Sequence, residues 1–463
     1  MAKTKRKANI IVDSIPGMGK TELLQQVQKY FKQEFNGDVH IISLGDLFEE
    51  TPREVMYTKK RHIPKIDYLL KQMNRNATIE KAKNHMLQHQ NESIIIDTPL
   101  TIFAGEQPIP NIVRLPSEFT SIDDIRSIDT IVSVINAPEI VAEKLKHTPY
   151  SHKIGELLDW IALDTEIAKS HAMSLTDFNK RKQALYSQII KIPQPVLEEY
   201  VPELYSQIRE FLKQDPTSHY VNHIVMPKQN AVISLLKLLY DYKDNGKRSV
   251  VVYAAGPITS VKVKDGEKGE IVKEKLDEEK RINEFSRKLQ EYGLIVNPIV
   301  LADTTYDDKG KAHTTHRDLN YFVPYSDLII AFYPSNRRTI DIEENETESG
   351  KEIIKTVKDG RSIGTETEMR YALMMGKPVI LIHPTKEDMA GDVFGIQPTV
   401  HFRHEDEFLE ALTDLEHSKI NENPVLMRDL RMLLGKDGKP KYHDFGEIIK
   451  EFYQPFVINN QFS

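Results

Sequence analysis

Short apolar runs alternate with longer amphipathic segments along the first half of the chain. Apolar runs bounded by polar residues predict strands at 8–12, 39–43, 94–97, 130–135 and 220–225. Apolar residues at helical spacing predict helices at 20–34, 138–146, 154–173, 177–189, 195–213 and 230–241. Such alternation is typical of a parallel sheet wrapped by helices, so the expected fold class is α/β.

The alternation starts again after a polar break at 244–248 (DNGKR), which contains a turn dipeptide. Further strands are predicted at 249–253, 294–298, 327–333 and 378–382, and a further helix at 275–292. The polar stretches 304–316 and 336–358 are predicted as exposed loops. We therefore expect domains at 1–244 and 249–404, followed by a helical C-terminal tail at 405–463.

Composition narrows the possible functions. The chain has 463 residues, of which 40% are hydrophobic and 28% charged, so it can form substantial cores. Its net charge of −7 argues against a general nucleic-acid binder, which carries a basic surface. No apolar run approaches the length of a membrane span. The absence of cysteine excludes disulfides and thiolate metal sites. A cytoplasmic location is expected, with the basic segment 3–7 as a solvated tail.

Residues 14–21 (SIPGMGKT) lie between a predicted strand and a predicted helix, which is the context of a phosphate-binding loop. Backbone N–H groups of such a loop and the positive end of the helix bind phosphate oxygens. Here Gly17 and Gly19 would shape the loop, Lys20 would reach the β- and γ-phosphates, and Thr21 would ligate Mg²⁺. Ser14 replaces the first glycine of the pattern, and an ordinary strand–turn–helix connection is the structural alternative.

This loop and three later segments resemble archaeal-type adenylate kinases. The later segments are 45–48 (GDLF), 96–98 (IDT) and 137–140 (APEI). The resemblance covers about 1–240 and implies a P-loop, kinase-like domain that binds ATP and Mg²⁺. It also implies that Asp97 supports the Mg²⁺ ion or its water ligands. An acid that caps a turn or helix is the alternative for Asp97.

The chain departs from that family where the family has an arginine-rich lid. Residues 143–150 (EKLKHTPY) contain lysines and no arginine. Phosphoryl transfer depends on fixed positive charge at the moving group, and a lysine is no equal substitute for an arginine. Nucleotide binding is therefore expected, while kinase turnover stays open. The arginines that remain as candidates are Arg53, Arg61, Arg114 and Arg126.

A second set of residues predicts chemistry in the later domain. Residues 364–372 (GTETEMRYA) combine a glycine, a carboxylate and the first turn of a helix, and 376–379 (GKPV) ends that helix before a strand. A carboxylate there lies at the carboxyl edge of a parallel sheet, where open α/β folds bind ligands. Upstream, residues 253–257 (YAAGP) end another predicted strand, and Gly256 lets a ligand approach the backbone closely.

Four of these pieces, in order, resemble the nucleoside 2-deoxyribosyltransferase superfamily, including its deoxynucleoside 5′-monophosphate N-hydrolase branch. They are Tyr-x-x-Gly-Pro, Arg-Asp-Leu, Gly-Thr-x-x-Glu and Gly-Lys-Pro-Val, and they span about 249–400. The resemblance implies a flavodoxin-like, doubly wound domain. It makes Glu368 the nucleophile at the anomeric carbon, Asp318 the acid that assists the leaving base, and Tyr253 the residue that orients Glu368.

The same resemblance assigns a substrate-binding role to Gly256, Pro257, Ser362 and Gly364. Ser362 stands where the deoxyribosyltransferases have an acid that contacts the sugar. The monophosphate hydrolases have serine there, which helps to hold the 5′-phosphate, so the resemblance favours a nucleotide over a free nucleoside.

Each of these residues also has a purely structural interpretation. Glu368 can be an acid in the first turn of a helix that interacts favourably with the helix dipole. Asp318 can be a surface acid, and Tyr253 can be a core residue. Glu366 is the rival carboxylate and is expected to face solvent. The other structural expectations are a strand-start turn for Asp327, a loop for Asp359 and packing for Trp160. His313 and His316 have no neighbour at metal-site spacing.

The expected function is cleavage or exchange of the N-glycosidic bond of a 2′-deoxynucleotide, in an enzyme with a second, ATP-binding domain. One alternative is a nucleotide-sensing defence or stress effector that degrades nucleotides or NAD. The other is a nucleotide-binding module without catalysis, in which Glu368 is structural. The second resemblance also implies a homo-oligomer.

Overall fold

The structure is a computed structural model that divides into two compact units, Met1–Arg248 and Ser249–Ser463. It describes residues 8–50, 77–89, 92–104, 107–110, 128–147, 152–189, 191, 195, 220–244, 249–257, 270–298, 317–334, 338–347, 350–359, 362–384, 397–453 and 455. Each unit contains one five-stranded sheet whose neighbouring strands all run parallel, so the α/β class is confirmed.

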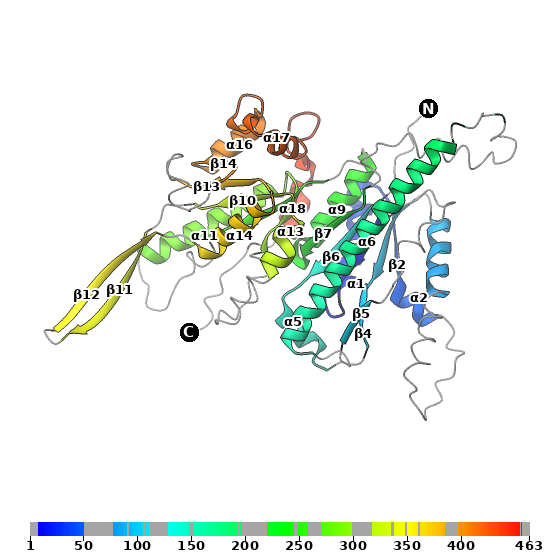
Figure 1. The fold of residues 1–463 in the computed structure, drawn as a ribbon, viewed down its shortest axis with the longest axis horizontal. Helices are drawn as coiled ribbons and strands as arrows, with labels where there is room; N and C mark the ends of the chain where they lie inside the picture. The colour runs from blue at the N-terminus through cyan, green and yellow to red at the C-terminus, as the bar shows by residue number, and fades with distance from the viewer. Residues whose placement is uncertain are drawn as a thin grey trace. The chain divides into compact units, whose positions relative to one another are not determined.

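The sheet of the first unit has the order β2-β3-β1-β6-β7 (Figure 1). Its strands are β1 (Asn9–Asp13), β2 (Val39–Ser43), β3 (Ser93–Thr98), β6 (Thr130–Ile135) and β7 (Asn222–Pro227). A separate hairpin pairs β4 (Thr101–Ala104) with β5 (Gln107–Pro110). The strands β1 and β6 are buried at every position, as helices on both faces of a parallel sheet require.

Helices cover both faces of this sheet. They are α1 (Lys20–Phe35), α2 (Leu44–Glu50), α5 (Pro138–Leu145), α6 (Ile154–Ile189) and α9 (Lys228–Asp244), and 77–88 is also helical. On one face α1 lies beside α9, where the Phe35 and Tyr240 rings are 5.4 Å apart. On the other face α6 and the helix 77–88 enclose a core that includes Ile11, Ile96 and Leu175.

The prediction of two helices at 154–173 and 177–189 is wrong, because α6 runs unbroken from Ile154 to Ile189. Neither glycine nor proline occurs in the region between them, and Leu175 is fully buried there. The hydroxyl of Thr176 accepts a hydrogen bond from the Val221 N–H at 3.0 Å, which ties this turn of the helix to the residues that precede β7. The predicted helix 195–213 lies outside the described residues except for its first position.

The sheet of the second unit has the order β14-β13-β10-β8-β9. Its strands are β8 (Val251–Ala255), β9 (Leu294–Val296), β10 (Leu328–Phe332), β13 (Val379–Ile382) and β14 (Val400–Phe402). The chain places β9 on one side of β8 and β10 on the other. The carboxyl ends of β8 and β10 therefore form a topological switch point, where open α/β sheets bind ligands.

Helices and short helical turns cover this second sheet. They are α11 (Glu270–Leu289), the π-helical turn η3 (Asp318–Phe322), α13 (Val323–Tyr325), α14 (Ile363–Met374), α16 (Glu405–Thr413), η5 (Lys419–Glu422), α17 (Pro424–Arg431), η6 (His443–Phe445) and α18 (Gly446–Phe452). Val252 and Ala254 of β8 belong to the core formed with α11, α16 and α17. Because side chains alternate along a strand, Tyr253 projects to the opposite face.

Within 336–358, expected as a loop, the described residues 338–347 and 350–358 form most of a long antiparallel hairpin. It pairs β11 (Arg338–Thr347) with β12 (Gly350–Asp359), and Asp359, also expected in a loop, is the last residue of β12 (Figure 1). β-branched residues recur through both strands despite the acidic composition, and such residues favour extended backbone. Residues 304–316, the other expected loop, lie outside the described part of the chain.

Residues 405–453 contain the helical segments α16, η5, α17, η6 and α18, separated by turns, and several of their apolar side chains pack in the core of the second unit. Phe408 and Leu412 of α16 and Leu426 and Leu430 of α17 are fully buried in the core of that unit. Met427 and Leu433 extend the same apolar surface. The helices of this region therefore cover one face of the sheet.

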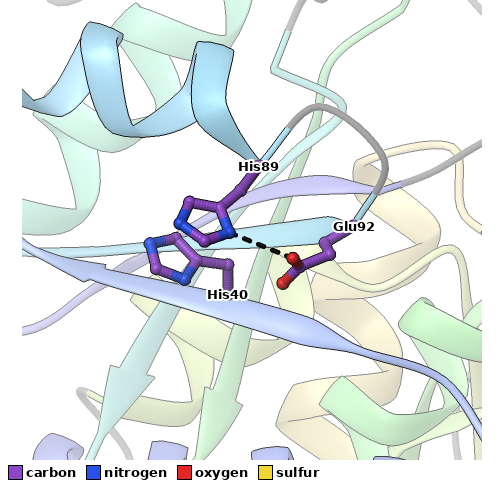
Figure 2. Close-up of side chains that lie close together, drawn as sticks. All are labelled: His40, His89 and Glu92. Atoms are coloured by element: carbon purple, nitrogen blue, oxygen red, sulfur yellow. Dashed lines mark hydrogen bonds and ion pairs between the residues drawn. The ribbon is translucent and has the colours of Figure 1, made fainter.

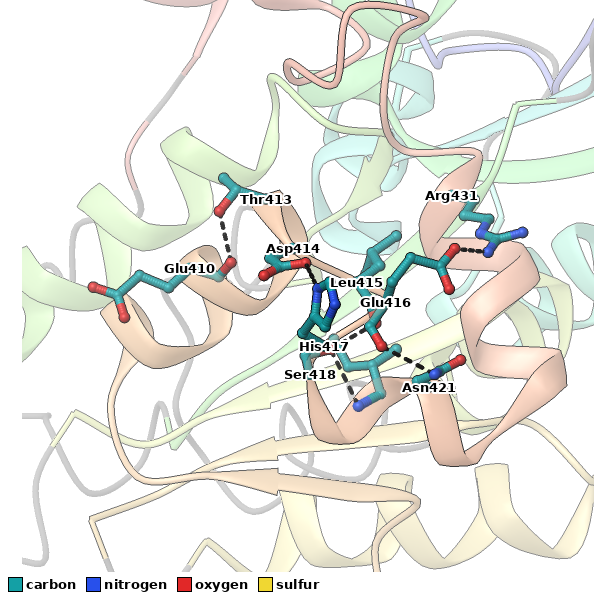
Figure 3. A network of polar contacts seen from close by, with 10 residues as sticks. Glu410, Thr413, Asp414, Leu415, Glu416, His417, Ser418, Asn421 and Arg431 are labelled. Atoms are coloured by element: carbon teal, nitrogen blue, oxygen red, sulfur yellow. Dashed lines mark hydrogen bonds and ion pairs between the residues drawn. The ribbon is translucent and has the colours of Figure 1, made fainter.

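Polar contacts fix the turn between α16 and α17 (Figure 3). Nδ1 of His417 lies 2.8 Å from Oδ1 of Asp414, and the hydrogen bond and charge of Asp414 raise the pKa of His417. Asn421 donates to the Glu416 carbonyl at 3.0 Å, and the Glu416 carboxylate forms an ion pair with Arg431. These contacts bring the chain back so that α17 packs on the core.

We expect Leu430→Ala to lower the free energy of unfolding of the second unit by about 2–5 kcal/mol, because it leaves a cavity in a packed core. Val425→Ala is the matched control: Val425 is 50% exposed on the same helix, so we expect a loss below about 0.5 kcal/mol. The only tryptophan, Trp160, lies in the first unit, so amide hydrogen exchange of β10 and β13 is the suitable measurement. Equal effects of the two substitutions would contradict a structural role of this region.

Candidate functional site

The loop between β1 and α1 is shaped by two glycines with left-handed backbone. Gly17 has φ 87° and Gly19 has φ 78°, a region that residues with a Cβ rarely adopt. Gly19 is also the N-cap residue of α1, which begins at Lys20. The loop therefore presents the first N–H groups of α1 at the carboxyl end of the sheet, an arrangement that favours anions.

Lys20 and Asp97, predicted for phosphate and metal, form an ion pair with each other. Nζ of Lys20 lies 2.9 Å from Oδ1 of Asp97, and their side chains are only 11% and 13% exposed. Asp97 lies near the end of β3, which pairs directly with β1, and this pairing brings it to the loop. Thr21 and Asp97 line the same cavity of about 380 Å³, together with Ser43 and Asp46 of the neighbouring β2 and α2.

Two further lysines approach the loop from distant parts of the chain. A Cβ at Gly19 would lie 2.7 Å from Nζ of Lys228 and 3.6 Å from Nζ of Lys144. Burial and the charge of Lys144 lower the pKa of Lys228. Lys144 belongs to the predicted lid segment, whereas Lys228 was not predicted. Only the packing of α5 and α9 around α1 brings these ammonium groups together.

A buried pair of carboxyl groups lies behind this loop. Asp13 ends β1 and accepts a hydrogen bond from the Leu100 N–H at 2.8 Å. Burial and Asp164 of α6 raise the pKa of Asp13, and burial likewise raises that of Asp164. Trp160 donates to the Thr101 hydroxyl at 2.7 Å and is fully buried, in agreement with its predicted packing role. The sequence pattern did not reveal Asp164, because it belongs to an amphipathic helix that is far from the loop in the sequence.

In the second unit, the start of α14 is fastened to the end of β8. Ser362 is the N-cap residue of α14, and its hydroxyl accepts from the Thr365 N–H at 3.4 Å. The Thr365 hydroxyl in turn donates to the Gly256 carbonyl at 2.9 Å. Gly364 lies in the first turn of α14, and Pro257 is buried just after β8. The predicted residues of both segments therefore meet at the switch point.

The end of α14 follows the sequence prediction. Gly376 has φ 72°, and the N–H groups of Gly376 and Lys377 donate to the carbonyls of Leu373 and Ala372 at 2.9 and 3.0 Å. This left-handed cap satisfies the last carbonyls of the helix and turns the chain into β13. The caps at the two ends of α14 thus fix the helix that carries Glu368.

Glu368, Asp318 and Tyr253 interact with one another, although they are far apart in the sequence. Burial and the charge of Asp318 raise the pKa of Glu368 well above its ordinary value, while the nearby Tyr253 hydroxyl and the charge of Arg317 act in the opposite direction. Tyr253 is fully buried, and burial and the two carboxylates raise its pKa. The residue Glu368 as a whole keeps some exposed surface, while its carboxyl group is buried enough for burial to be the largest cause of its raised pKa.

Arg317 is a member of this group that was not assigned a role from the sequence. Its Nε lies 3.1 Å from Oδ1 of Asp318, and both side chains are nearly inaccessible. A terminal nitrogen of Arg317 also donates to the Pro298 carbonyl at 3.3 Å. Burial raises the pKa of Asp318, and Arg317 opposes this rise. Asp318 opens the π-helical turn η3, a distortion that is frequent at functional sites.

Two further residues, Tyr333 and Asp327, lie on either side of β10 in the sequence. Tyr333, which follows β10, was not predicted; its pKa is raised by burial and by the charges of Glu366 and Glu368, so it lies beside α14. Asp327 precedes β10 and accepts from the Val251 N–H at 2.9 Å, as expected for a strand-start residue. The other predicted residues that lie outside the described part of the chain are Arg53, Arg61, Arg114, Arg126, His313, His316 and 3–7.

No protein-family model matches this chain, and no curated protein matches its sequence. Among the helices in the described ranges, none combines the length and the apolar character needed to cross a membrane. The residues and their geometry are therefore the basis of the functional proposal.

The raised pKa of Glu368 makes the stability of the second unit depend on pH. Protonated Glu368 contributes stability that is fully present below its unfolded pKa, about 4.3, and is lost as the pH rises through the higher folded pKa. We expect Glu368→Gln, which cannot ionise, to gain stability relative to wild type as the pH rises. In Tyr253→Phe the loss should extend to higher pH, because the hydroxyl that favours the charged form of Glu368 is removed. Hydrogen exchange of β8 and β10 at several pH values measures both effects. A difference in stability between Glu368→Gln and wild type that does not change with pH would contradict the raised pKa of Glu368.

Proposed function

We propose that the second unit cleaves or exchanges the N-glycosidic bond of a 2′-deoxynucleotide. The observation that carries this proposal is the direct electrostatic coupling of Glu368, Asp318 and Tyr253 at the switch point of the sheet. Two coupled carboxyl groups in one site supply a nucleophile and an acid, which are the groups that glycosidic cleavage with a covalent intermediate requires. The strand order also supports the proposal, because numbering the five strands along the chain gives 2-1-3-4-5, the flavodoxin-like order.

In the proposed reaction, a carboxylate oxygen of Glu368 attacks C1′ of the deoxyribosyl group. The bond between C1′ and the base nitrogen breaks, and its electron pair leaves with the base, which takes a proton from Asp318. Asp318 then removes a proton from water or from a second base, which attacks C1′ and releases Glu368. The two displacements together retain the configuration at C1′. In this reaction the Tyr253 hydroxyl, which lies near Glu368, would orient the Glu368 carboxylate.

This reaction requires that Asp318 is protonated and that Glu368 is ionised. In the protein without substrate, the ion pair with Arg317 favours a charged Asp318, while burial and the charge of Asp318 favour a protonated Glu368. A substrate phosphate that attracted Arg317 would remove this support from Asp318. The proton would then move to Asp318, and Glu368 would become the nucleophile. An anionic substrate would in this way activate the pair of carboxyl groups.

We propose that the first unit binds the phosphates of a nucleotide, with ATP as the expected ligand, at a P-loop formed by residues 14–21. The buried ammonium of Lys20, the two positive-φ glycines and the start of α1 support this proposal. A bound phosphate would compete with Asp97 for Lys20. Asp97 would then be available with Thr21 to hold Mg²⁺ directly or through water, since both line the same cavity.

Lys144 and Lys228 supply positive charge at the place where a kinase-like protein needs it. Within the part of the chain that the structure describes, neither lysine forms an ion pair with a carboxylate, so both can bind an anion near Gly19. Lysine ammonium groups lack the planar fork of arginine. We therefore propose nucleotide binding for this unit, with slow or no phosphoryl transfer, which agrees with a sensing role. A cytoplasmic, oligomeric protein remains a prediction.

We expect Glu368→Ala to reduce release of free base from deoxynucleoside 5′-monophosphates by at least about 100-fold, the scale of losing a positioned catalytic group. Glu366→Ala, on the same helix, is the matched control and should keep activity within a few-fold. Product analysis by liquid chromatography and mass spectrometry over a panel of bases measures both. Unchanged base release in Glu368→Ala would reject the proposed nucleophile.

We expect Lys20→Ala to weaken ATP binding by at least about 10-fold in calorimetry, because a buried charge-assisted contact to phosphate is lost. Base release by the same variant at saturating substrate without ATP should stay at the wild-type rate. Retained ATP affinity would reject the phosphate-binding loop. Loss of base release would show that the two sites are not independent.

A further inference from the structure

Two histidines and a glutamate form a cluster at the edge of the first sheet that shares no residue with the two sites above (Figure 2). His40 belongs to β2, the edge strand, His89 directly follows the helix 77–88, and Glu92 precedes β3. Each offers one possible ligand atom, and these atoms all lie within 4.8 Å of one another. All three residues are partly exposed, so an ion can reach them from solvent.

The local fold holds these side chains together. The imidazole rings of His40 and His89 are stacked, with centroids 3.5 Å apart and planes 8° from parallel. Nδ1 of His89 lies 3.0 Å from Oε1 of Glu92. Because β2 pairs with β3 in register, His40 lies opposite Ile94, close to the turn that carries Glu92. The helix 77–88 and two neighbouring strands thus fix one cluster from three segments.

We propose that His40, His89 and Glu92 form a binding site for a divalent transition-metal ion of the zinc class. Two imidazole nitrogens and a carboxylate oxygen are a ligand set that zinc binds, with metal–ligand distances of about 2.0–2.2 Å. Ligand atoms of a tetrahedral site lie about 3.3 Å apart, so the cluster must contract from its present spacing of up to 4.8 Å. The lone pairs of stacked rings run parallel, and one imidazole must therefore turn about its side-chain torsions to share an ion with the other. Water or a further ligand completes the coordination.

This site is chemically distinct from the Mg²⁺ site proposed at Thr21 and Asp97. Imidazole nitrogen favours zinc, nickel, cobalt or copper over magnesium, which prefers oxygen ligands. The two sites are nevertheless neighbours, because His40 and His85 line the same cavity as Thr21 and Asp97. An ion that joins β2 to the helix 77–88 would therefore fix one wall of that cavity. The site would act as a structural or regulatory clamp on the proposed nucleotide-binding unit.

Zinc titration of the full-length protein by calorimetry, in a buffer that does not chelate metals, tests the proposal. We expect one site with micromolar or tighter affinity. The variants His40→Ala, His89→Ala and Glu92→Gln should each weaken it at least about 10-fold, the scale of losing one metal ligand. Because zinc binds only the folded site, it should also raise the temperature at which the fluorescence of Trp160 reports unfolding of the first unit. Circular dichroism checks that the variants are folded.

Two matched substitutions make the test specific. His85 lies one helical turn before His89, and its ring stacks at 6.0 Å from that of His40, but it is not part of the cluster within 4.8 Å. His85→Ala and Lys20→Ala should therefore leave the zinc affinity within a few-fold of wild type. Absence of a site tighter than millimolar would overturn the proposal. So would retained affinity in all three ligand variants, or a loss in His85→Ala as large as that in His40→Ala.

Discussion

Parallel strand pairing is the constraint on which both units depend. Every strand of the two main sheets runs in the same direction as its neighbours, so each connection must cross a face of the sheet and return. All carboxyl ends then meet at one edge. The residues that follow the strands are therefore brought to the carboxyl edge of their own sheet although they are far apart in the sequence. Asp97, after the apolar part of β3, lies at this edge of the first sheet, and Gly256, after β8, lies at this edge of the second. Both proposed sites are consequences of this arrangement.

The second constraint is the burial of charge. In the second unit, Arg317 compensates for Asp318, and the Tyr253 hydroxyl favours the charged form of Glu368, so two acids can exist side by side in a largely buried site. In the first unit, Lys20 pairs with Asp97 in front of the buried carboxyl groups of Asp13 and Asp164. A buried charge without compensation costs several kcal/mol. Each compensating contact is one that a bound anion or a proton can replace, which is why these groups are suited to chemistry.

The strands were predictable because they are apolar on both sides and end at polar residues; β2 and β6 begin and end where the sequence indicated. The stop of α14 was predictable because Gly376 alone provides the left-handed cap. The predictions of a break within α6 and of a loop in place of β11 and β12 were wrong. They followed local polarity, whereas long-range packing and strand pairing determine the structure of these regions. The positions of Lys228 and Asp164 and the hydrogen bond from Arg317 to the Pro298 carbonyl depend on contacts between distant segments, which no local pattern reveals.

The proximity of Lys144 and Lys228 has a consequence for the life of the protein in the cell. Two like charges held beside Gly19 make the ligand-free loop electrostatically unfavourable, and an anion between them turns repulsion into attraction. Any ligand that binds only the folded form raises its population by mass action. The turnover of this protein by proteases would then slow when polyphosphate-bearing metabolites are abundant and quicken when they are depleted.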